Sequence, residues 1–399
     1  CGHALGDQLL QNVAQRLKNL SEKYDDSTQQ QVFRLGSDEF AYLCSPQLEE
    51  QYSVALAKQL IDTLSMPYDV EHAQVEISAC IGITQIRNGN DDATQIIKRA
   101  DLALQRAKQS SEPIALYAED MDEALNRQIA LAPLLRQAIK CDELHLAFQP
   151  KICSHDHSVH GFEVLCRWND HNGQAIPADW FITTAENSRL IKPLTEWVIK
   201  RLLSIESEWQ RRQMPRNLAF NLSARLLDNT ALIRKLCEKL RASQGYCEFE
   251  FEITESSLMT NPKRALASIN AIRQAGFAIS IDDYGTGYSS LAYLCDLDAS
   301  ALKIDRSFIT NCHSNETNRI IVSSTVRMAH ELGLRTVAEG IETAEEEKLL
   351  HSLGCDYLQG YRYSKPLVLD EIIPWFEKWQ LQQHANIKRV EDYRPNKQG

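Results

Sequence analysis

The sequence contains no apolar run long enough to span a membrane. Its first residues, CGHALGD, also lack the basic and then apolar character of a secretion signal. We therefore expect this segment to be cytoplasmic. Cys1 is not a natural start, so any membrane attachment of the full-length protein is expected to lie in a region before it.

Paired cysteines are missing too. The 11 cysteines stand singly, with no CxxC spacing and an odd total. This pattern indicates thiols in a reducing compartment rather than disulfides or a zinc site. His155, Asp156 and His157 do stand together, but a second well-spaced pair of ligands is missing. We interpret that segment as a polar hairpin loop.

Clusters of lysine and arginine are absent as well. With a formal net charge of −11, the composition argues against a nucleic-acid partner. An anionic substrate would then require bound metal ions or a few well-placed cations. The 399 residues, 43% of them hydrophobic, are enough for two or three domains with full cores.

The first part of the chain mixes helical and strand patterns. An amphipathic helix is followed by a hairpin over 32–43, and the remaining elements are a helix over 54–64, strands over 68–70 and 75–84, a helix over 94–108 and a strand over 114–117. This order predicts an α+β domain with an antiparallel sheet. We assign residues 1–118 to this domain, 119–136 to a helical linker, 137–380 to a second domain and 381–399 to a polar C-terminal tail.

The second domain alternates strand and helix patterns, which predicts a (β/α)₈ TIM barrel. The strand-like runs are 145–151, 160–168, 217–223, 248–254, 277–282, 301–305, 334–339 and 355–359. The gap between the first two runs is too short for a parallel crossover. The first strand is therefore expected to be antiparallel to its neighbour, which makes this a modified barrel.

Each of these runs carries a polar residue, near its C-terminal end in all but the second. They are Gln149, Glu163, Asn221, Glu252, Asp282 with Asp283, Lys303, Glu339 and Gln359. In such barrels the C-terminal strand ends converge on one site. Five carboxylates at one mouth repel one another unless cations are bound there. Oxygen donors without histidine or cysteine select Mg²⁺ or Mn²⁺, and two such ions promote hydrolysis of a phosphate ester.

Four segments of the first domain, GHALGDQLL, RLGSDEF, ISACIGIT and RADLALQRAK, resemble the later part of a GGDEF domain, the diguanylate cyclase fold. The family's upstream strand would precede Cys1. Asp7 matches a guanine-contacting aspartate, which implies GTP as a possible ligand. Ser37 replaces the second glycine of the motif and the inhibitory RxxD pattern is missing at 27–30, so we expect an inactive or weakly active cyclase domain.

Seven segments of the second domain resemble the EAL domain, a cyclic di-GMP phosphodiesterase, over about residues 124 to 380. They are GFEVLCRW, AFNLSA, FEITES, SIDDYGTGYSSL, LKIDRSF, VAEGIET and LQGY. The resemblance implies a barrel with an antiparallel first strand and hydrolysis of cyclic di-GMP to linear pGpG with Mg²⁺ or Mn²⁺. It also implies a homodimer.

The same resemblance implies a role for each site residue. Glu163, Asn221, Glu252 and Asp282 match ligands of a first metal ion, and Asp282, Asp283 and Glu339 match ligands of a second. Lys303 matches the lysine that orients or deprotonates the attacking water, Gln359 matches a residue near that water, and Glu255 matches the glutamate that anchors the loop after Asp283. Gln149, Arg167 and Asp305 match substrate contacts.

Two alternatives remain open. The barrel could be a non-catalytic sensor that binds cyclic di-GMP, although such modules usually lose several of the acids that this sequence keeps. The chain could also be a bifunctional cyclase and phosphodiesterase, against which Ser37 weighs.

Overall fold

The computed structural model describes residues 3–22, 30–36, 38–44, 50–70, 73–86, 92–109, 112–242, 245–255, 258, 261–285 and 297–392. The chain divides into two compact units, Cys1–Arg127 and Gln128–Gly399. Of the helices in the described ranges, none combines the length and apolar character that crossing a membrane requires.

The first unit packs helices against short strand pairs. Its elements are α1 (His3–Ser21), β1 (Gln31–Arg34), β2 (Phe40–Leu43), α2 (Glu50–Ser65), β3 (Tyr68–Val70), β4 (Ala73–Val75), β5 (Ile81–Ile83), α3 (Ala93–Gln109) and β6 (Ile114–Leu116). The apolar faces of α1 and α2 meet in a core around Leu17, Leu60 and Tyr68. This is the helical spacing of apolar residues that buries one face of an amphipathic helix.

The expectation of an antiparallel sheet is wrong for one strand pair of the first unit. β1 pairs antiparallel with β2, and β3 with β4. In contrast, β5 and β6 are parallel. Helix α3 lies between them in the chain and contacts both, so it forms the crossover that two parallel neighbours require.

Helix α4 (Glu119–Cys141) contains all of the segment that we assigned to a linker. Its first turn carries Glu119, Asp120 and Asp122, and acidic side chains at a helix N-terminus interact favourably with the helix dipole. The division between the two units falls inside this helix, after Arg127.

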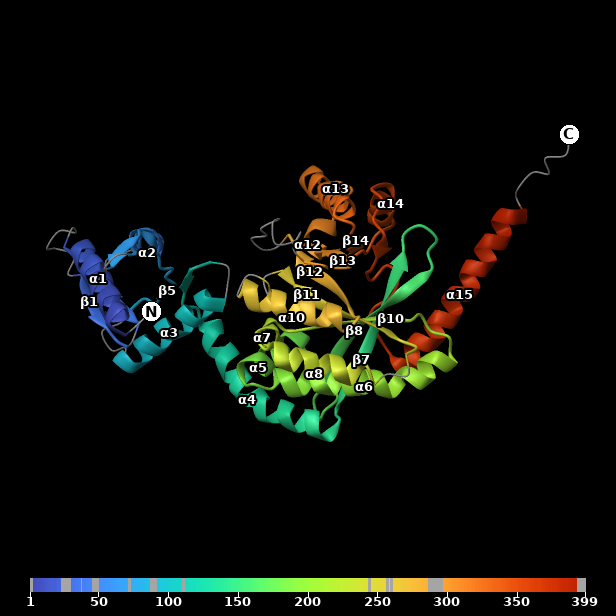
Figure 1. Ribbon diagram of the computed structural model, residues 1–399, viewed down its shortest axis with the longest axis horizontal. Coiled ribbons are helices and arrows are strands. Elements are labelled where there is room, and N and C mark those ends of the chain that lie inside the picture. Colours follow the sequence, from blue (N-terminus) through green and yellow to red (C-terminus); the bar gives the residue numbers. More distant parts are fainter. Residues whose placement is uncertain are drawn as a thin grey trace. The chain divides into compact units, whose positions relative to one another are not determined.

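Within the described residues of the second unit, eight strands close into a barrel (Figure 1). They are β7 (Leu144–Cys153), β8 (Val159–Asn169), β10 (Asn217–Asn221), β11 (Glu248–Thr254), β12 (Ala278–Tyr284), β13 (Ala301–Ile304), β14 (Arg335–Ala338) and β15 (Tyr357–Leu358). β7 is antiparallel to both β8 and β15, and the other pairs are parallel. The modified barrel predicted from the spacing is confirmed.

Helices surround the barrel strands (Figure 1). They are α5 (Ala178–Asn187), α6 (Ile191–Arg211), α7 (Ala224–Leu227), α8 (Thr230–Leu240), α10 (Pro262–Gln274), α12 (Arg306–Ile309), α13 (Glu316–Glu331) and α14 (Ala344–Ser352). Two short strands, β9 (Ala175–Ile176) and β16 (Leu367–Val368), pair with β8 and β7. Helix α15 (Leu369–Asp392) continues through residues 381–392 of the segment assigned to the polar tail.

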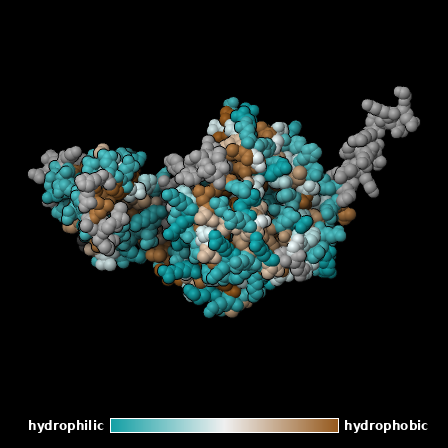
Figure 2. Space-filling model, viewed as in Figure 1, coloured by the Kyte–Doolittle hydropathy of each residue, from teal (hydrophilic) through white to brown (hydrophobic). Residues whose placement is uncertain are grey.

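The core between strands and helices is apolar and aromatic. Phe148 and Phe162 pack on the indole of Trp209, with ring centroids 5.1 and 5.3 Å apart, and Phe220 packs on Phe251. Hydrophilic residues cover most of the barrel unit's face in Figure 2, with smaller hydrophobic areas between them. The aromatic contacts show that strand residues facing the helices form the core. The residues that face the inside of the barrel include polar and charged ones.

Candidate functional site

Neighbouring strands bring the polar residues at their ends together at the mouth of the barrel. We call this set the ring; its members are Gln149, Glu163, Asn221, Glu252, Asp282, Asp283, Lys303, Glu339 and Gln359. Parallel pairing places Asn221 opposite Glu252, and antiparallel pairing places Gln149 opposite Glu163. Since alternate residues of a strand point to the same face, these side chains project into the barrel. The centre of the ring is buried, since Lys303 and Glu252 are each 1% exposed. Asn221 is exposed, and Asp283 and Glu339 are half-buried.

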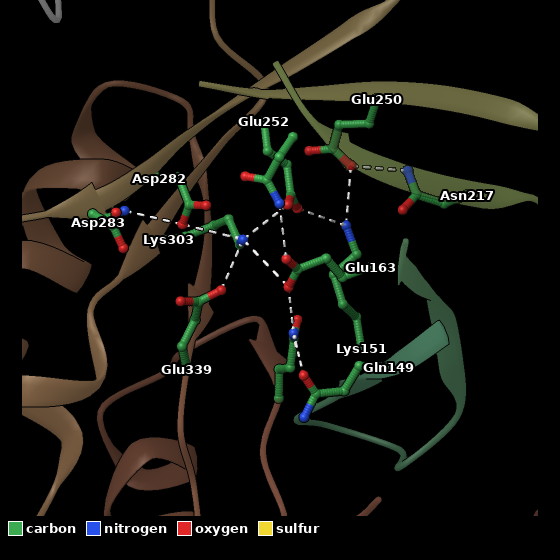
Figure 3. A network of polar contacts seen from close by, with 12 residues as sticks. Gln149, Lys151, Glu163, Asn217, Glu250, Glu252, Asp282, Asp283, Lys303 and Glu339 are labelled. Carbon is green, nitrogen blue, oxygen red and sulfur yellow. Dashed lines mark hydrogen bonds and ion pairs between the residues drawn. The ribbon is translucent and has the colours of Figure 1, made fainter. Parts of the chain in front are cut away.

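Lys303, on β13, lies at the centre of the ring (Figure 3). Its Nζ is 2.8 Å from Glu339 Oε1, 3.0 Å from Glu252 Oε2, 3.1 Å from Asp282 Oδ1 and 3.6 Å from Glu163 Oε2. One ammonium group thus contacts carboxylates from four different strands or strand ends. Lys303 points toward the mouth, and the acids converge on it.

A chain of hydrogen bonds connects one side of this ring. Gln359 donates from Nε2 to Glu163 Oε2 at 2.6 Å and to Gln149 Oε1 at 3.1 Å. Asn221 donates to the other oxygen of Glu163 at 3.1 Å, and Gln149 donates to the carbonyl of Ser364 at 3.2 Å. The two glutamines and Asn221 therefore fix the orientation of Glu163.

On the other side of the ring, β12 is irregular where it delivers the paired aspartates. The β12–β13 register shifts between Ile281 and Tyr284, and Asp283 adopts a left-handed backbone with φ of +54°. Its N–H donates to Asp282 Oδ1 at 2.9 Å. This geometry brings ligand atoms of Asp282, Asp283 and Glu339 within 4.8 Å of one another, a set that could hold a metal ion.

Glu255 lies just beyond β11 and holds the turn after Asp283. Its Oε2 accepts a hydrogen bond from the N–H of Gly285 at 2.8 Å, and its side chain is buried. The rest of the loop after Gly285, residues 286–296 with Gly287, lies outside the described residues.

The crowded carboxylates perturb one another's ionisation. Burial, together with the charges of Asp282 and Asp305, raises the pKa of Asp283 to about 6. Burial also raises the pKa of Glu252 well above its ordinary value, and that of Glu339 upward. Burial opposes the charge of Lys303, but the surrounding carboxylates outweigh it and raise the lysine's pKa. The site has an excess of negative charge that a single lysine does not balance.

The donor set fits a hard divalent cation. Among the described residues, neither carboxylate oxygen of the buried Glu252 accepts a hydrogen bond with acceptable geometry. Its described counter-charges are the ammonium groups of Lys303, 3.0 Å from Oε2, and Lys151, 3.8 Å from Oε1. A bound cation would stabilise this buried carboxylate further. The surrounding donors are carboxylate and amide oxygens, which suit Mg²⁺ or Mn²⁺.

Two residues expected to contact substrate lie outside this connected ring. Asp305 caps the short helix α12, where its Oδ1 accepts from the backbone N–H and the hydroxyl of Ser307. Arg167, further along β8, donates to the carbonyl of Cys166 at 2.9 Å. Neither makes a described hydrogen bond to the ring.

A second polar layer, which was not predicted from the sequence, lies beneath the ring. Lys151 forms a buried ion pair with Glu250, and Asn217 donates to the same Glu250 oxygen (Figure 3). The signal was present as strand alternation: Lys151 stands two residues from Gln149, and Glu250 two residues from Glu252. Residues at that spacing share a face.

The other sequence predictions fall outside the barrel mouth. Asp156 accepts from the N–H and hydroxyl of Ser158, which is the geometry of a polar turn. Asp7 lies in α1 of the first unit. Ser37 and residues 27–29 lie outside the described residues.

Comparison with known proteins finds similarity along most of the chain. Residues 134–366 match a family model described as EAL domain, and residues 1–112 match one described as Diguanylate cyclase, GGDEF domain. Cyclic di-GMP phosphodiesterase PdeR of Escherichia coli (strain K12) is 31% identical over 95% of this chain and 56% of its own length. The bifunctional diguanylate cyclase/cyclic di-GMP phosphodiesterase MucR of Pseudomonas aeruginosa is 34% identical over 93% of this chain and 54% of its own.

A solved structure of the PaMucR phosphodiesterase in complex with c-di-GMP has a TM-score of 0.56 and 34% identity, covering 62% of this chain and 99% of that one. The chain spans about half the length of the curated relatives it matches.

Proposed function

Because the chain belongs to the EAL domain family and carries a GGDEF domain before the barrel, we propose that it hydrolyses cyclic di-GMP to linear pGpG. The observation that carries this proposal is the convergence of Glu163, Glu252, Asp282 and Glu339 on Lys303. The names of the similar proteins PdeR and MucR supply the substrate.

We assign the oxygen donors to two ions of Mg²⁺ or Mn²⁺. Glu163, Asn221, Glu252 and Asp282 would hold one, and Asp282, Asp283 and Glu339 would hold the other. Ions of this type lower the pKa of a bound water and offset charge on phosphoryl oxygens. The hydrogen bonds that Gln359 and Asn221 donate to Glu163 orient that ligand.

Lys303 would orient the attacking water through a hydrogen bond that its ammonium group donates. The carboxylates around Lys303 raise its pKa, whereas bound divalent cations would lower it. Deprotonation of the water by Lys303 is therefore the alternative role, and it requires the bound ions. Gln359 would contact the same water.

Substrate contacts are assigned to Gln149, Arg167 and Asp305. Arg167 offers a planar guanidinium, which suits a phosphate or a guanine edge, and Gln149 borders the ring through its bond to Gln359. Glu255 would hold the turn that carries Asp283.

Turnover by the purified chain tests this function. With cyclic di-GMP and either Mn²⁺ or Mg²⁺, pGpG is expected as the product on chromatography. Glu163→Gln and Lys303→Met are expected to lower kcat/KM by about 100-fold or more. Glu248→Gln is the matched control, because this exposed glutamate on β11 pairs only with Arg216 among the contacts described.

The alternatives give different results in the same assay. Tight binding of cyclic di-GMP without pGpG, with both metals supplied, would indicate a sensor. Cyclic di-GMP formed from GTP would indicate a bifunctional enzyme.

We also propose a role for the first unit and an oligomeric state for the chain. We assign the GGDEF unit a regulatory role through GTP, with Asp7 as a guanine contact, and we expect a homodimer. A GTP-dependent change in kcat or KM, and a dimer mass by light scattering, are the expected results. An unchanged rate with GTP, or a monomer at assay concentration, would contradict the respective assignment.

A further inference from the structure

The polar layer beneath the ring consists of Lys151, Glu250 and Asn217. Lys151 and Glu250 are 2% and 5% exposed, so both charges are removed from water. Their placement follows from strand direction. β7 is antiparallel to its neighbours, so Lys151, two residues after Gln149, lies one layer deeper, as does Glu250, two residues before Glu252.

The layer is closely fitted. Lys151 pairs in register with Gly161, and a Cβ added at Gly161 would lie 2.5 Å from the carbonyl oxygen of Asn217 and 2.7 Å from its side-chain oxygen. The missing side chain leaves space for Asn217, whose Nδ2 donates to Glu250 Oε2 at 3.0 Å.

Lys151 lies between two glutamates of one strand. Its Nζ is 3.2 Å from Glu250 Oε2 and 3.8 Å from Glu252 Oε1. Glu252 is one of the proposed metal ligands, whereas Glu250 is not. Glu250 is therefore the anion that competes with Glu252 for the Lys151 ammonium group.

The net charge of the ring shows what Lys151 would do to the metal site without Glu250. Its five carboxylates and one lysine carry a formal charge of −4 when ionised, which two divalent cations would balance. Lys151 would be a surplus cation if Glu250 did not neutralise it. Without Glu250, Glu252 would be the described carboxylate next to Lys151, 3.8 Å from its Nζ. Pairing with Glu252 would offset the cost of the buried ammonium group.

We propose that Glu250 is a positioning residue for the metal site: it holds the Lys151 ammonium one layer below the ring and thereby keeps Glu252 available to a divalent cation. This inference rests on the proposed two-metal function. A positioning role of Glu250 and a merely structural role lead to different expectations for metal binding. Removing either partner of the ion pair should destabilise the fold, but only removal of the glutamate should weaken metal binding.

The inference is tested by measuring Mn²⁺ binding to the full chain without substrate. Titration calorimetry and the electron paramagnetic resonance signal of free Mn²⁺ both report this binding. Glu250→Gln is expected to weaken Mn²⁺ binding about 10- to 100-fold. Lys151→Met is expected to bind Mn²⁺ at least as tightly as the wild type. The double variant Lys151→Met with Glu250→Gln, which lacks the surplus cation, is expected to recover most of the lost affinity.

Thermal unfolding and circular dichroism establish that each variant is folded. Should Glu250→Gln not fold, Glu250→Asp takes its place, since it withdraws the carboxylate from Lys151 by one methylene, and weaker Mn²⁺ binding is again expected. Wild-type Mn²⁺ affinity in the folded Glu250 variant, or equally weakened binding in Lys151→Met, would overturn this inference but not the proposed function. A wild-type protein that binds no Mn²⁺ would overturn the two-metal function as well.

Discussion

The ammonium group of Lys303 offsets part of the repulsion among the carboxylates of the ring. It is a fully buried cation that contacts four acids from separate strands or strand ends. Breaking such a group by removing the cation leaves several buried charges unpaired. The same carboxylates that stabilise the ammonium are the donors that we assign to metal ions, so in the proposed function a lysine and two cations would share one set of oxygens.

The first prediction at the residue scale concerns stabilisation by metal. Mn²⁺ at about 100 times its dissociation constant is expected to raise Tm by roughly 5–10 °C, because a ligand of the native state stabilises it by about 2.7 kcal/mol at that excess. Differential scanning calorimetry with Mn²⁺ and with EDTA measures the shift.

Asp282→Asn is expected to abolish most of that shift, since Asp282 is assigned to both ions. Asp298→Asn, an exposed aspartate that pairs with Arg273, serves as the control. Equal shifts in both variants would contradict the assignment of Asp282.

At the scale of elements, the turn that ends β12 determines where the paired aspartates lie. Gly285 has φ of +97° and a Cβ there would lie 2.8 Å from the ring of Phe308. Phe308 belongs to α12, which follows β13 and Lys303 directly. A side chain at Gly285 would therefore displace the elements that carry the ring.

Gly285→Ala is expected to lower the free energy of unfolding by about 2–4 kcal/mol, combining backbone strain with overpacking. Gly276→Ala is the matched control, because Gly276 has φ of +87° but nothing within 4 Å of its Cβ. Urea denaturation measures both. Equal losses in the two variants would show that the contact with Phe308 contributes nothing.

Asp356 directly precedes β15, at the end of the barrel opposite the ring, and its side chain is hydrogen-bonded to residues of α13 and β14. Its carboxylate accepts hydrogen bonds from His330 Nε2, Arg335, and the N–H and hydroxyl of Thr336, all at 2.8–2.9 Å. Burial raises the pKa of Asp356, but these bonds outweigh burial and lower it below its ordinary value.

Stabilisation from a lowered carboxyl pKa is present above the unfolded value, near pH 4, and is lost as the pH falls through the folded pKa. Asp356→Asn is therefore expected to cost about 2–3 kcal/mol at pH 7 and progressively less below pH 4. Urea unfolding at several pH values measures the difference from wild type, with Asp298→Asn as control. A cost independent of pH would contradict this account.

At the scale of the molecule, each unit has its own core. The apolar cluster around Leu17 and Tyr68 belongs to the first unit, and the barrel cluster around Phe148 and Trp209 to the second. The solved PaMucR phosphodiesterase chain corresponds to only 62% of this chain yet is covered over 99% of its own length. Separate cores are the physical requirement for separate folding.

A fragment of residues 119–399 is accordingly expected to unfold cooperatively and to retain cyclic di-GMP hydrolysis within about tenfold of the full chain. Circular dichroism and the pGpG assay measure the two properties, with Glu163→Gln in the same fragment as the inactive control. A fragment that aggregates, or that folds but has lost turnover, would show that the barrel depends on the first unit.

The sequence by itself determined the strands of the barrel, the antiparallel first strand and the polar residues at the strand ends. These features depend on local alternation and on the lengths of connections, which are read along the chain. Only the tertiary structure decided the parallel pairing of β5 with β6, the left-handed turn at Asp283 and the buried pair of Lys151 with Glu250. Each of these depends on which distant residues become neighbours. Lys151 and Glu250 are 99 positions apart, and only the barrel's register and opposite strand directions place both charges in one layer.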